Sequence, residues 1–265
     1  MSTATPLLVC SGYSDTGPVR RSNEDAFLVD SELRLFAVAD GMGGHNAGEV
    51  ASQQAIEAIA SFIRRSHTQS DDVSWPYGIE PKLSYQGNRL RTAINLANRR
   101  VFRSAEAHDE YTGMGSTVAA LLFGNRSVVV GHIGDSRVYL SRGSSLTQLT
   151  QDDTWAVAML AEDPDSDLSS VASHPMKHVL TNVLGSKEHT ESHVTEHPFV
   201  TGDRWLICSD GLHGVLDEQY LQDCLANVVS QEIEAASSRL VAAALERGTK
   251  DNVTAIVVYV QEGVE

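Results

Sequence analysis

The chain contains 265 residues, with 20 Lys and Arg against 35 Asp and Glu, so its net charge is −15 when histidine is neutral. This acidity argues against binding to nucleic acid or to anionic membranes, because both repel a net anion. The three cysteines lack C-x-x-C spacing and are too few for a disulfide framework or a zinc site. Because no apolar run approaches the roughly 18 residues of a membrane helix, we expect a cytoplasmic protein.

The beginning of the chain predicts two strands and a helix. Residues 26–29 are typical of a first strand, and residues 33–39 of a buried second strand. Asn46 and Glu49 have the spacing of a capping box, in which each side chain bonds an unpaired backbone N–H group. The apolar stripe over residues 51–63 follows at helical period and predicts a helix.

The rest of the chain predicts a second long helix, a series of strands and a further pair of helices. An apolar stripe predicts a helix over residues 87–108, and the polar stretch before it, about 66–86, is predicted as an insertion. Residues 161–173 are acidic and rich in serine, which indicates a mobile surface segment. The remaining elements are predicted as strands at 117–123, 127–133, 137–141, 146–149, 191–197, 204–209 and 253–260, and as helices at 217–228 and 231–247. This order predicts an α+β protein in which sheets pack on each other with helices outside.

Acidic residues gather where the predicted strands begin or end. Six of them stand at such positions: Glu24, Asp25, Asp40, Asp135, Asp210 and Asp251. Any single Asp before a Gly is most often a turn residue. Strand ends on one edge of a sandwich can converge, however, and several carboxylates share a pocket only when cations neutralise them.

The chemistry of such a pocket favours hard divalent ions. Carboxylate oxygens without His or Cys select Mg²⁺, Mn²⁺ or Ca²⁺. A carboxylate that bridges two ions makes a two-metal site, which activates a water for in-line attack on phosphorus. The glycine after Asp40 would let the backbone approach an ion, and its carbonyl could be a ligand.

Seven short motifs, in order, resemble the PPM/PP2C family of metal-dependent protein serine/threonine phosphatases in its compact bacterial form. They are Ser14-Asp15-Thr16-Gly17, Arg20 with Asn23-Glu24-Asp25, Asp40-Gly41-Met42-Gly43-Gly44, Gly113-Met114-Gly115-Ser116-Thr117, Gly134-Asp135-Ser136-Arg137, Ser209-Asp210-Gly211-Leu212 and Asp251-Asn252-Val253-Thr254. One motif alone is common by chance, whereas seven in family order form a specific signal. They cover the chain from about Gly12 to Val260.

The resemblance implies a two-metal centre, of Mg²⁺ or Mn²⁺, built from four positions. Asp40 would bridge both ions, and the carbonyl of Gly41 would join one of them. Asp210 and Asp251 would hold the other ion.

The resemblance also implies roles around that centre. Glu24 and Asp25 match the acidic pair that supports the site, directly or through water. Asp135 matches the residue that, with Asp210, holds a third and weaker metal in bacterial relatives. Arg20 has the spacing of the phosphate-binding arginine of the family, and its planar fork suits two phosphate oxygens at once.

For the whole chain, the resemblance implies a central antiparallel β-sandwich with a helical layer on each side. Residues 1–265 would form a single catalytic domain, with a flap-like segment at about 156–185 that borders the active site and influences substrate choice. The implied activity is hydrolysis of phosphoserine and phosphothreonine in proteins by direct attack of a metal-activated water. The implied partners are phosphorylated protein substrates, and we expect a monomer.

Two residues depart from the family pattern. Eukaryotic members have a His, proposed as the general acid, where this chain has Met42, although bacterial members commonly share the Met. His45 and a metal-bound water are the candidates for the proton donor here. Asp153 stands where relatives usually carry a His, and the sequence offers no physical reason for that change.

Two alternatives to the protein phosphatase stay open at this stage. A non-catalytic member acting as a binding module would be expected to lose metal ligands, and none of the metal positions is lost. A phosphatase of a small phosphorylated metabolite would share the chemistry and differ only outside the metal pocket.

Overall fold

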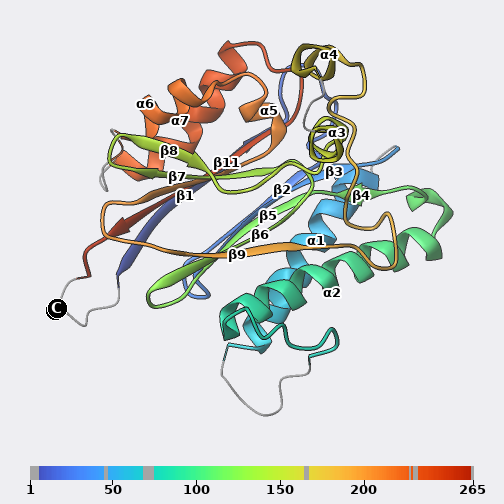
Figure 1. Cartoon of the computed structure of the whole chain (residues 1–265), viewed down its shortest axis with the longest axis horizontal. Helices are drawn as coiled ribbons and strands as arrows, with labels where there is room; N and C mark the ends of the chain where they lie inside the picture. Colours follow the sequence, from blue (N-terminus) through green and yellow to red (C-terminus); the bar gives the residue numbers. More distant parts are fainter. Residues whose placement is uncertain are drawn as a thin grey trace.

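The protein, seen here as a computed structural model, is a sandwich of two antiparallel sheets with helices on both outer faces (Figure 1). The structure describes residues 6–44, 47–67, 75–163, 167–226, 228 and 232–263. The first sheet has the order β1 (Leu7–Asp15), β11 (Val253–Gln261), β10 (Arg204–Cys208), β7 (Arg137–Arg142) and β8 (Ser145–Gln148). The second has the order β2 (Asp25–Asp30), β3 (Leu35–Met42), β5 (Val118–Phe123), β6 (Ser127–Ile133) and β9 (His193–Pro198), with β4 (Gly115–Ser116) paired to β3.

The helices form the two outer layers. Helices α1 (Ala47–Arg65) and α2 (Tyr85–Ala107) cover the second sheet, and a 3₁₀ turn, η1 (Asp109–Tyr111), follows α2. Helices α5 (Asp210–His213), α6 (Glu218–Ala226) and α7 (Ile233–Glu246) cover the first sheet on the opposite side (Figure 1). The predicted α+β sandwich with helical layers on both sides is therefore confirmed.

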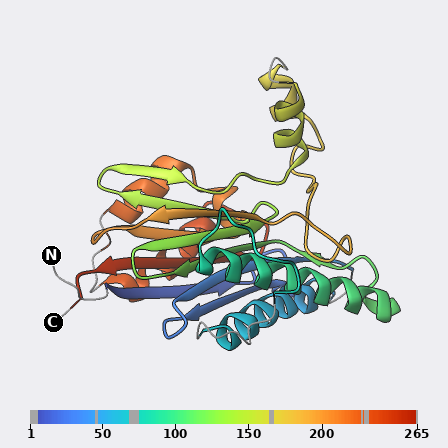
Figure 2. The ribbon, with the colours of Figure 1, turned by 60° about the horizontal axis from the view of Figure 1, so that its bottom comes forward.

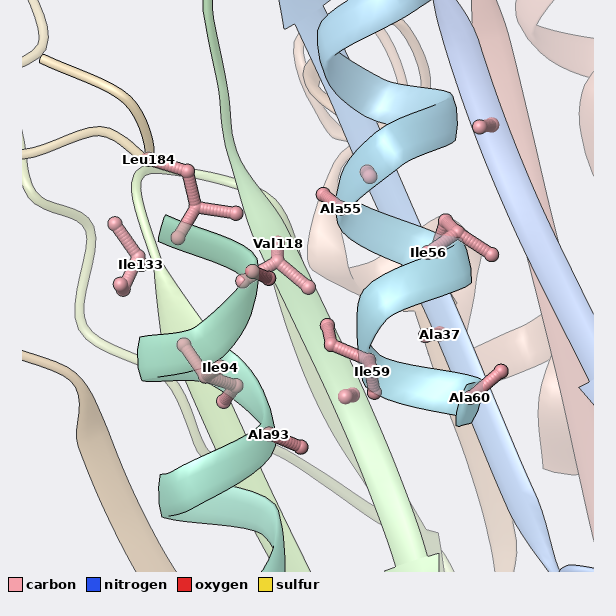
Figure 3. Close-up of a cluster of buried hydrophobic side chains, with 14 of the residues drawn as sticks. Ala37, Ala55, Ile56, Ile59, Ala60, Ala93, Ile94, Val118, Ile133 and Leu184 are labelled. Carbon is pink, nitrogen blue, oxygen red and sulfur yellow. The ribbon is translucent and has the colours of Figure 1, made fainter. Parts of the chain in front are cut away.

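Alternation along the central strands produces three apolar cores. In β3, Leu35 and Ala37 face α1 and α2, whereas Phe36 and Val38 face the other sheet. Figure 3 shows side chains of α1 and α2, such as Ile59 and Ile94, meeting the sheet in the first of these cores. Because successive strand side chains point to opposite faces, strands that are apolar on both faces must lie in the middle of a four-layer structure.

The ends of α1 and α2 show how the long helices are fixed. Ser84 caps α2 by accepting a hydrogen bond from the backbone N of Gly87 at 3.1 Å. Arg89 is buried and donates to the carbonyl of Ile63 and to the hydroxyl of Ser66 at the end of α1. The carbonyl of Ile63 is one of the groups that the last turn of a helix leaves without an internal partner.

Three sequence-based expectations about the elements need comment. The first strand is β1, not the predicted run at 26–29, and β1 pairs along its whole length with β11 at the other end of the chain. The polar insertion ends at Ser84, because α2 already begins at Tyr85. Of the capping box predicted for α1, Asn46 lies outside the described residues.

The segment predicted as a mobile surface stretch, residues 161–173, includes regular structure. Helix α3 (Trp155–Glu162) ends within it and helix α4 (Leu168–Ser173) follows, and the two helices project from the body of the molecule (Figure 2). The ring of Trp155 stacks on that of His174, with centroids 4.2 Å apart, which ties the base of the projection together. No helix among the residues that the structure describes is long and apolar enough to cross a membrane.

Candidate metal centre

Strand register brings the predicted acids to one edge of the sandwich. Asp25, the first residue of β2, is the direct partner of Asp40 near the end of β3. In the other sheet, β10 ends just before Asp210 and β11 begins just after Asp251, and these two strands are antiparallel neighbours. Antiparallel pairing places the end of one strand beside the start of the next. The four carboxylates therefore come from the same end of both sheets.

Two glycines allow the segments around these acids to approach closely. A Cβ atom added to Gly41 would lie 2.0 Å from the carbonyl oxygen of Gly48 and 2.7 Å from that of Glu24. A Cβ atom added to Gly211 would lie 2.0 Å from the carbonyl oxygen of Asn252. Any side chain at either position would push these segments apart. The glycine that follows each of Asp40 and Asp210 is thus a condition for the cluster.

Asp25 is held in place between the two sheets. Its Oδ2 accepts hydrogen bonds from the hydroxyls of Ser209, at 2.8 Å, and Thr254, at 2.6 Å. The hydroxyl of Ser209 in turn accepts from the backbone N of Thr254 at 3.0 Å. These bonds join the start of β2 to the ends of β10 and β11, and so fix the orientation of one carboxylate.

Burial and mutual repulsion raise the pKa values of the clustered acids. Burial raises the pKa of Asp25 and of Asp135 to about 7, and the charge of Asp210 adds to both shifts. Burial, then the charges of Asp25 and Asp210, hold the pKa of Asp40 well above its usual range. Burial and the charge of Asp251 raise the pKa of Asp210. Each shift means that the surroundings oppose ionisation of the carboxyl group, first through burial and then through neighbouring negative charge.

Buried oxygens without hydrogen-bond partners also indicate a cation site. Oδ1 of Asp25 and Oδ1 of Asp210 are both buried, and neither has a hydrogen-bond partner. Buried polar atoms nearly always find partners, so such exceptions call for a missing ligand. The donor set consists of oxygens alone, which is the set that Mg²⁺ and Mn²⁺ accept. The residues present therefore fit a divalent metal centre.

The carboxylates are not yet arranged around an ion. The described part of the chain contains no ready group of three or more His, Cys, Asp or Glu side chains placed to hold a metal. Asp251 in particular points to Arg20, with 2.7 Å between its Oδ2 and the guanidinium Nη2. Metal binding would therefore have to reorient carboxylates, with the Arg20–Asp251 ion pair as one contact that competes with it.

Arg20 lies at the exposed rim of the cluster, and Asn252 fixes the loop that carries it. The Nδ2 of Asn252 donates to the carbonyls of Thr16, at 2.8 Å, and Ser22, at 3.0 Å. Its Oδ1 accepts from the backbone N of Glu24 at 2.8 Å. Sequence reasoning assigned no role to Asn252, Ser209 or Thr254, although each stands in a motif that carried the resemblance.

Glu24 and Asp135 lie at the margins of the cluster. The backbone carbonyl of Glu24 accepts from Gly41 N at 3.1 Å, and burial raises the pKa of its side chain. Asp135 is buried, with 8% of its surface exposed, and its carbonyl accepts from Nε2 of His213 at 3.0 Å. Burial lowers the pKa of His213 to about 4, so this ring is neutral at pH 7.

Asp153, which departs from the family pattern, ties three segments to one another. Its Oδ2 accepts from the backbone N of Gly134 and from Nδ2 of Asn182, both at 2.9 Å. Its Oδ1 lies 3.0 Å from Nε2 of His193 in β9. Because Gly134 immediately precedes Asp135, the carboxylate of Asp153 anchors the turn that presents Asp135. The structure thus supplies a physical role that the sequence did not.

Comparison with known proteins identifies the class to which this fold and this acid cluster belong. The family model described as protein phosphatase 2C matches residues 19–247. The chain belongs to the protein phosphatase 2C family. The resemblance drawn from the motifs is therefore confirmed.

Individual relatives are bacterial serine/threonine phosphatases. The chain is 36% identical, over 97% of its length, to the serine/threonine protein phosphatase PstP of Mycobacterium tuberculosis, and the match covers 46% of that protein. It thus spans about half the length of the first curated relative. It is 30% identical to the serine/threonine phosphatase stp of Listeria monocytogenes, over 92% of this chain and 93% of that protein.

Among solved structures, the chain resembles the catalytic domain of PstP in complex with two manganese ions. The TM-score is 0.80 at 33% identity, and the match covers 97% of this chain and 100% of that one. It also resembles Stp1 of Staphylococcus aureus, with a TM-score of 0.82 at 27% identity, over 99% of this chain and 98% of that one.

Proposed function

We propose that this chain hydrolyses phosphoserine and phosphothreonine in proteins, with two Mg²⁺ or Mn²⁺ ions as cofactors. The observation that carries the proposal is the cluster of Asp25, Asp40 and Asp210, whose pKa values are raised and two of whose buried oxygens lack partners. In a member of this phosphatase family, buried carboxylates with raised pKa values are expected where divalent cations bind, because the cations would supply the balancing positive charge.

We assign the ligands of the two ions by position in the family motifs. Asp40 would bridge the ions, the Gly41 carbonyl would join one, and Asp210 and Asp251 would hold the other. Strand register supports the assignment, since it brings these residues to one edge of both sheets. When bound, the ions would supply a nucleophilic water and neutralise charge on the phosphate.

The surrounding residues would support that centre. Asp25 is locked by two hydroxyls and would orient the ligands, together with Glu24. Asp135 would hold a third ion with Asp210, and the charge of Asp210 adds to the raised pKa of Asp135, which a cation between them would relieve. The turn that carries Asp135 is anchored by Asp153.

Arg20 would bind the phosphate. Its guanidinium is half exposed at the rim of the cluster, and the hydrogen bond to Asp251 raises its pKa, so it stays charged. A planar fork can bond two phosphate oxygens at once. Because the carboxylate of Asp251 forms an ion pair with Arg20, this pair would have to break when metal and phosphate bind. Asp251 would then bind a metal ion, and Arg20 would bind the phosphate.

The proton donor to the leaving alcohol stays a prediction. His45, one candidate, lies outside the described residues, and Met42, which is described, has no proton to give. We likewise propose that residues 1–265 act as one catalytic domain, that the protein is a monomer and that it is cytoplasmic. Its partners would be phosphorylated proteins.

Phosphate release from a phosphothreonine peptide, with and without Mn²⁺, tests this proposal. We expect turnover with Mn²⁺ and none after EDTA. Asp40→Asn and Asp210→Asn should each lower kcat by more than about 100-fold, the upper end of losses caused by partners that merely orient metal ligands. Asp217→Asn, at an exposed site on the outer helical layer, is the matched control and should keep full activity.

Calorimetric titration with Mn²⁺ separates the proposal from a non-catalytic binding module. Absence of binding at millimolar Mn²⁺, or full activity of Asp40→Asn, would refute the proposal. Hydrolysis of small phosphorylated metabolites in preference to phosphopeptides would instead favour the metabolite phosphatase.

A further inference from the structure

An apolar pocket of about 370 Å³ opens directly beside the proposed metal centre. Its lining includes Met42, Phe102 and Ala105 of α2, and Val183 of the flap-like segment. Met114 and Gly115 also line it. None of the functional assignments made above uses this pocket.

Gly115 lines the pocket without a side chain. A Cβ atom added to Gly115 would lie 3.4 Å from Cγ2 of Val183 and 3.5 Å from Cγ of Met42, within the space between them. Met42 leaves 42% of its surface exposed, so its side chain is open to contact. Glu106 is the one charged side chain of the lining, and it lies exposed on α2.

The pocket and the metal centre share a strand. Met42 follows Gly41 in β3, and the two residues pair with Gly115 and Ser116 of β4. Consecutive Cα atoms are about 3.8 Å apart, and an extended peptide advances about 3.3 Å per residue. A peptide whose phosphate reaches Asp40 and Gly41 therefore has neighbouring side chains within reach of Met42.

We propose that this pocket is a subsite for an aliphatic side chain, such as leucine, of the substrate peptide within a few residues of the phosphorylated Ser or Thr. The proposal rests on the function proposed above and adds a sequence preference to it. The occupant follows from the lining: apolar side chains and the flexible Met42 accommodate an aliphatic group, whereas Glu106 repels an acidic one. The volume lies within the range of sites that hold small ligands.

A set of phosphothreonine peptides tests this subsite. Each peptide carries a single leucine in place of alanine at one position within about three residues of the phosphothreonine. We expect kcat/KM to rise about tenfold for leucine over alanine at one of these positions, the discrimination that a few methylene groups give in an apolar pocket. Met42→Ala and Phe102→Ala should each reduce this ratio to about threefold or less.

The ratio within each variant removes effects on overall activity. Val200→Ala is the matched control, because Val200 is 51% exposed and precedes β10, at the end of the sandwich away from the acids. It should keep the wild-type ratio. An unchanged ratio in both Met42→Ala and Phe102→Ala, with each variant folded by circular dichroism, overturns the subsite, as does a wild-type protein without preference.

Hydrolysis of a small aryl phosphate with Mn²⁺ separates the two levels of failure. Wild-type turnover of the aryl phosphate without any leucine preference on peptides overturns the subsite alone. Failure to hydrolyse the aryl phosphate and every peptide overturns the proposed function, and the subsite with it.

Discussion

Replacing Asp25 with asparagine should stabilise the metal-free protein at alkaline pH. Burial raises the pKa of this carboxyl from 3.8 to about 7, so the folded state holds a proton that the unfolded state has released. Stability must then fall as pH rises between these two values, and above pH 7 the whole penalty is present. An asparagine side chain at this position would carry no charge and could still accept from Ser209 and Thr254.

The size of the effect follows from the same values. The difference between 3.8 and about 7, at about 1.4 kcal/mol per pH unit, corresponds to ~4 kcal/mol as an upper bound. Asp25 keeps some contact with solvent, so we expect Asp25→Asn to gain about 2 kcal/mol at pH 8. For a two-state protein, urea unfolding in EDTA at pH 8 and pH 5 measures this directly.

The same experiment contains its own controls. Asp30→Asn, at the other end of β2, removes a carboxylate that is paired with Arg64 at 3.1 Å, and should not stabilise the protein. Saturating Mn²⁺ should raise the stability of the wild type, because ions that bind only the folded state stabilise it. A metal-free Asp25→Asn protein that is less stable than the wild type at pH 8 would refute the electrostatic reasoning.

Three further predictions concern residues other than the predicted metal ligands. Trp205→Ala should cost about 3–5 kcal/mol of unfolding free energy, measured with urea, because Trp205 is fully buried between the sheets. Arg137→Lys should cost about 1–2 kcal/mol in the same assay, because lysine cannot keep the two-atom contact, at 2.9 and 2.7 Å, with Asp152; an unchanged midpoint would show that the contact is not stabilising. The hydrogen bond with Asp153 raises the pKa of His193 above 6.5, and, against burial, that bond lowers the pKa of Asp153 below 3.8. The ion pair therefore stabilises the fold fully between about pH 4 and 6.5. This stabilisation is lost at higher pH as His193 deprotonates, and at lower pH as Asp153 becomes protonated. When unfolding is measured at pH 5.5 and pH 8.5, His193→Gln should lose more stability at pH 5.5.

The central strands and long helices were predictable because their patterns are local. In β3 and β5 both faces are apolar, and the stripes of α1 and α2 repeat at helical period over several turns. The acids were predictable because they stand at the ends of those strands. Strand ends on one edge of a sandwich can converge, and strand register brings Asp25, Asp40, Asp210 and Asp251 to one edge.

The missed features depend on contacts between distant residues. β1 lacks a continuous apolar face, and it becomes a strand by pairing with β11. Helix α5 has only four residues, too few to show a period. The role of Asp153 depends on Gly134, Asn182 and His193, which lie 19, 29 and 40 residues away. A short stretch of sequence does not contain the members of this network, so local patterns could not predict it.

The pairing of β1 with β11 has a consequence for the order in which the site can form. The hydroxyl of Ser14 bonds that of Thr254 at 2.7 Å, and Asp25 also depends on Thr254. During synthesis the N-terminal part of a chain emerges first. Asp25 and Asp40 therefore lack their partners from β10 and β11 until β11 has left the ribosome. Asp251 can join Asp40 only after the residues of β11 have been made, so the ability to bind metal should appear in a single step, late in the synthesis of residues 1–261.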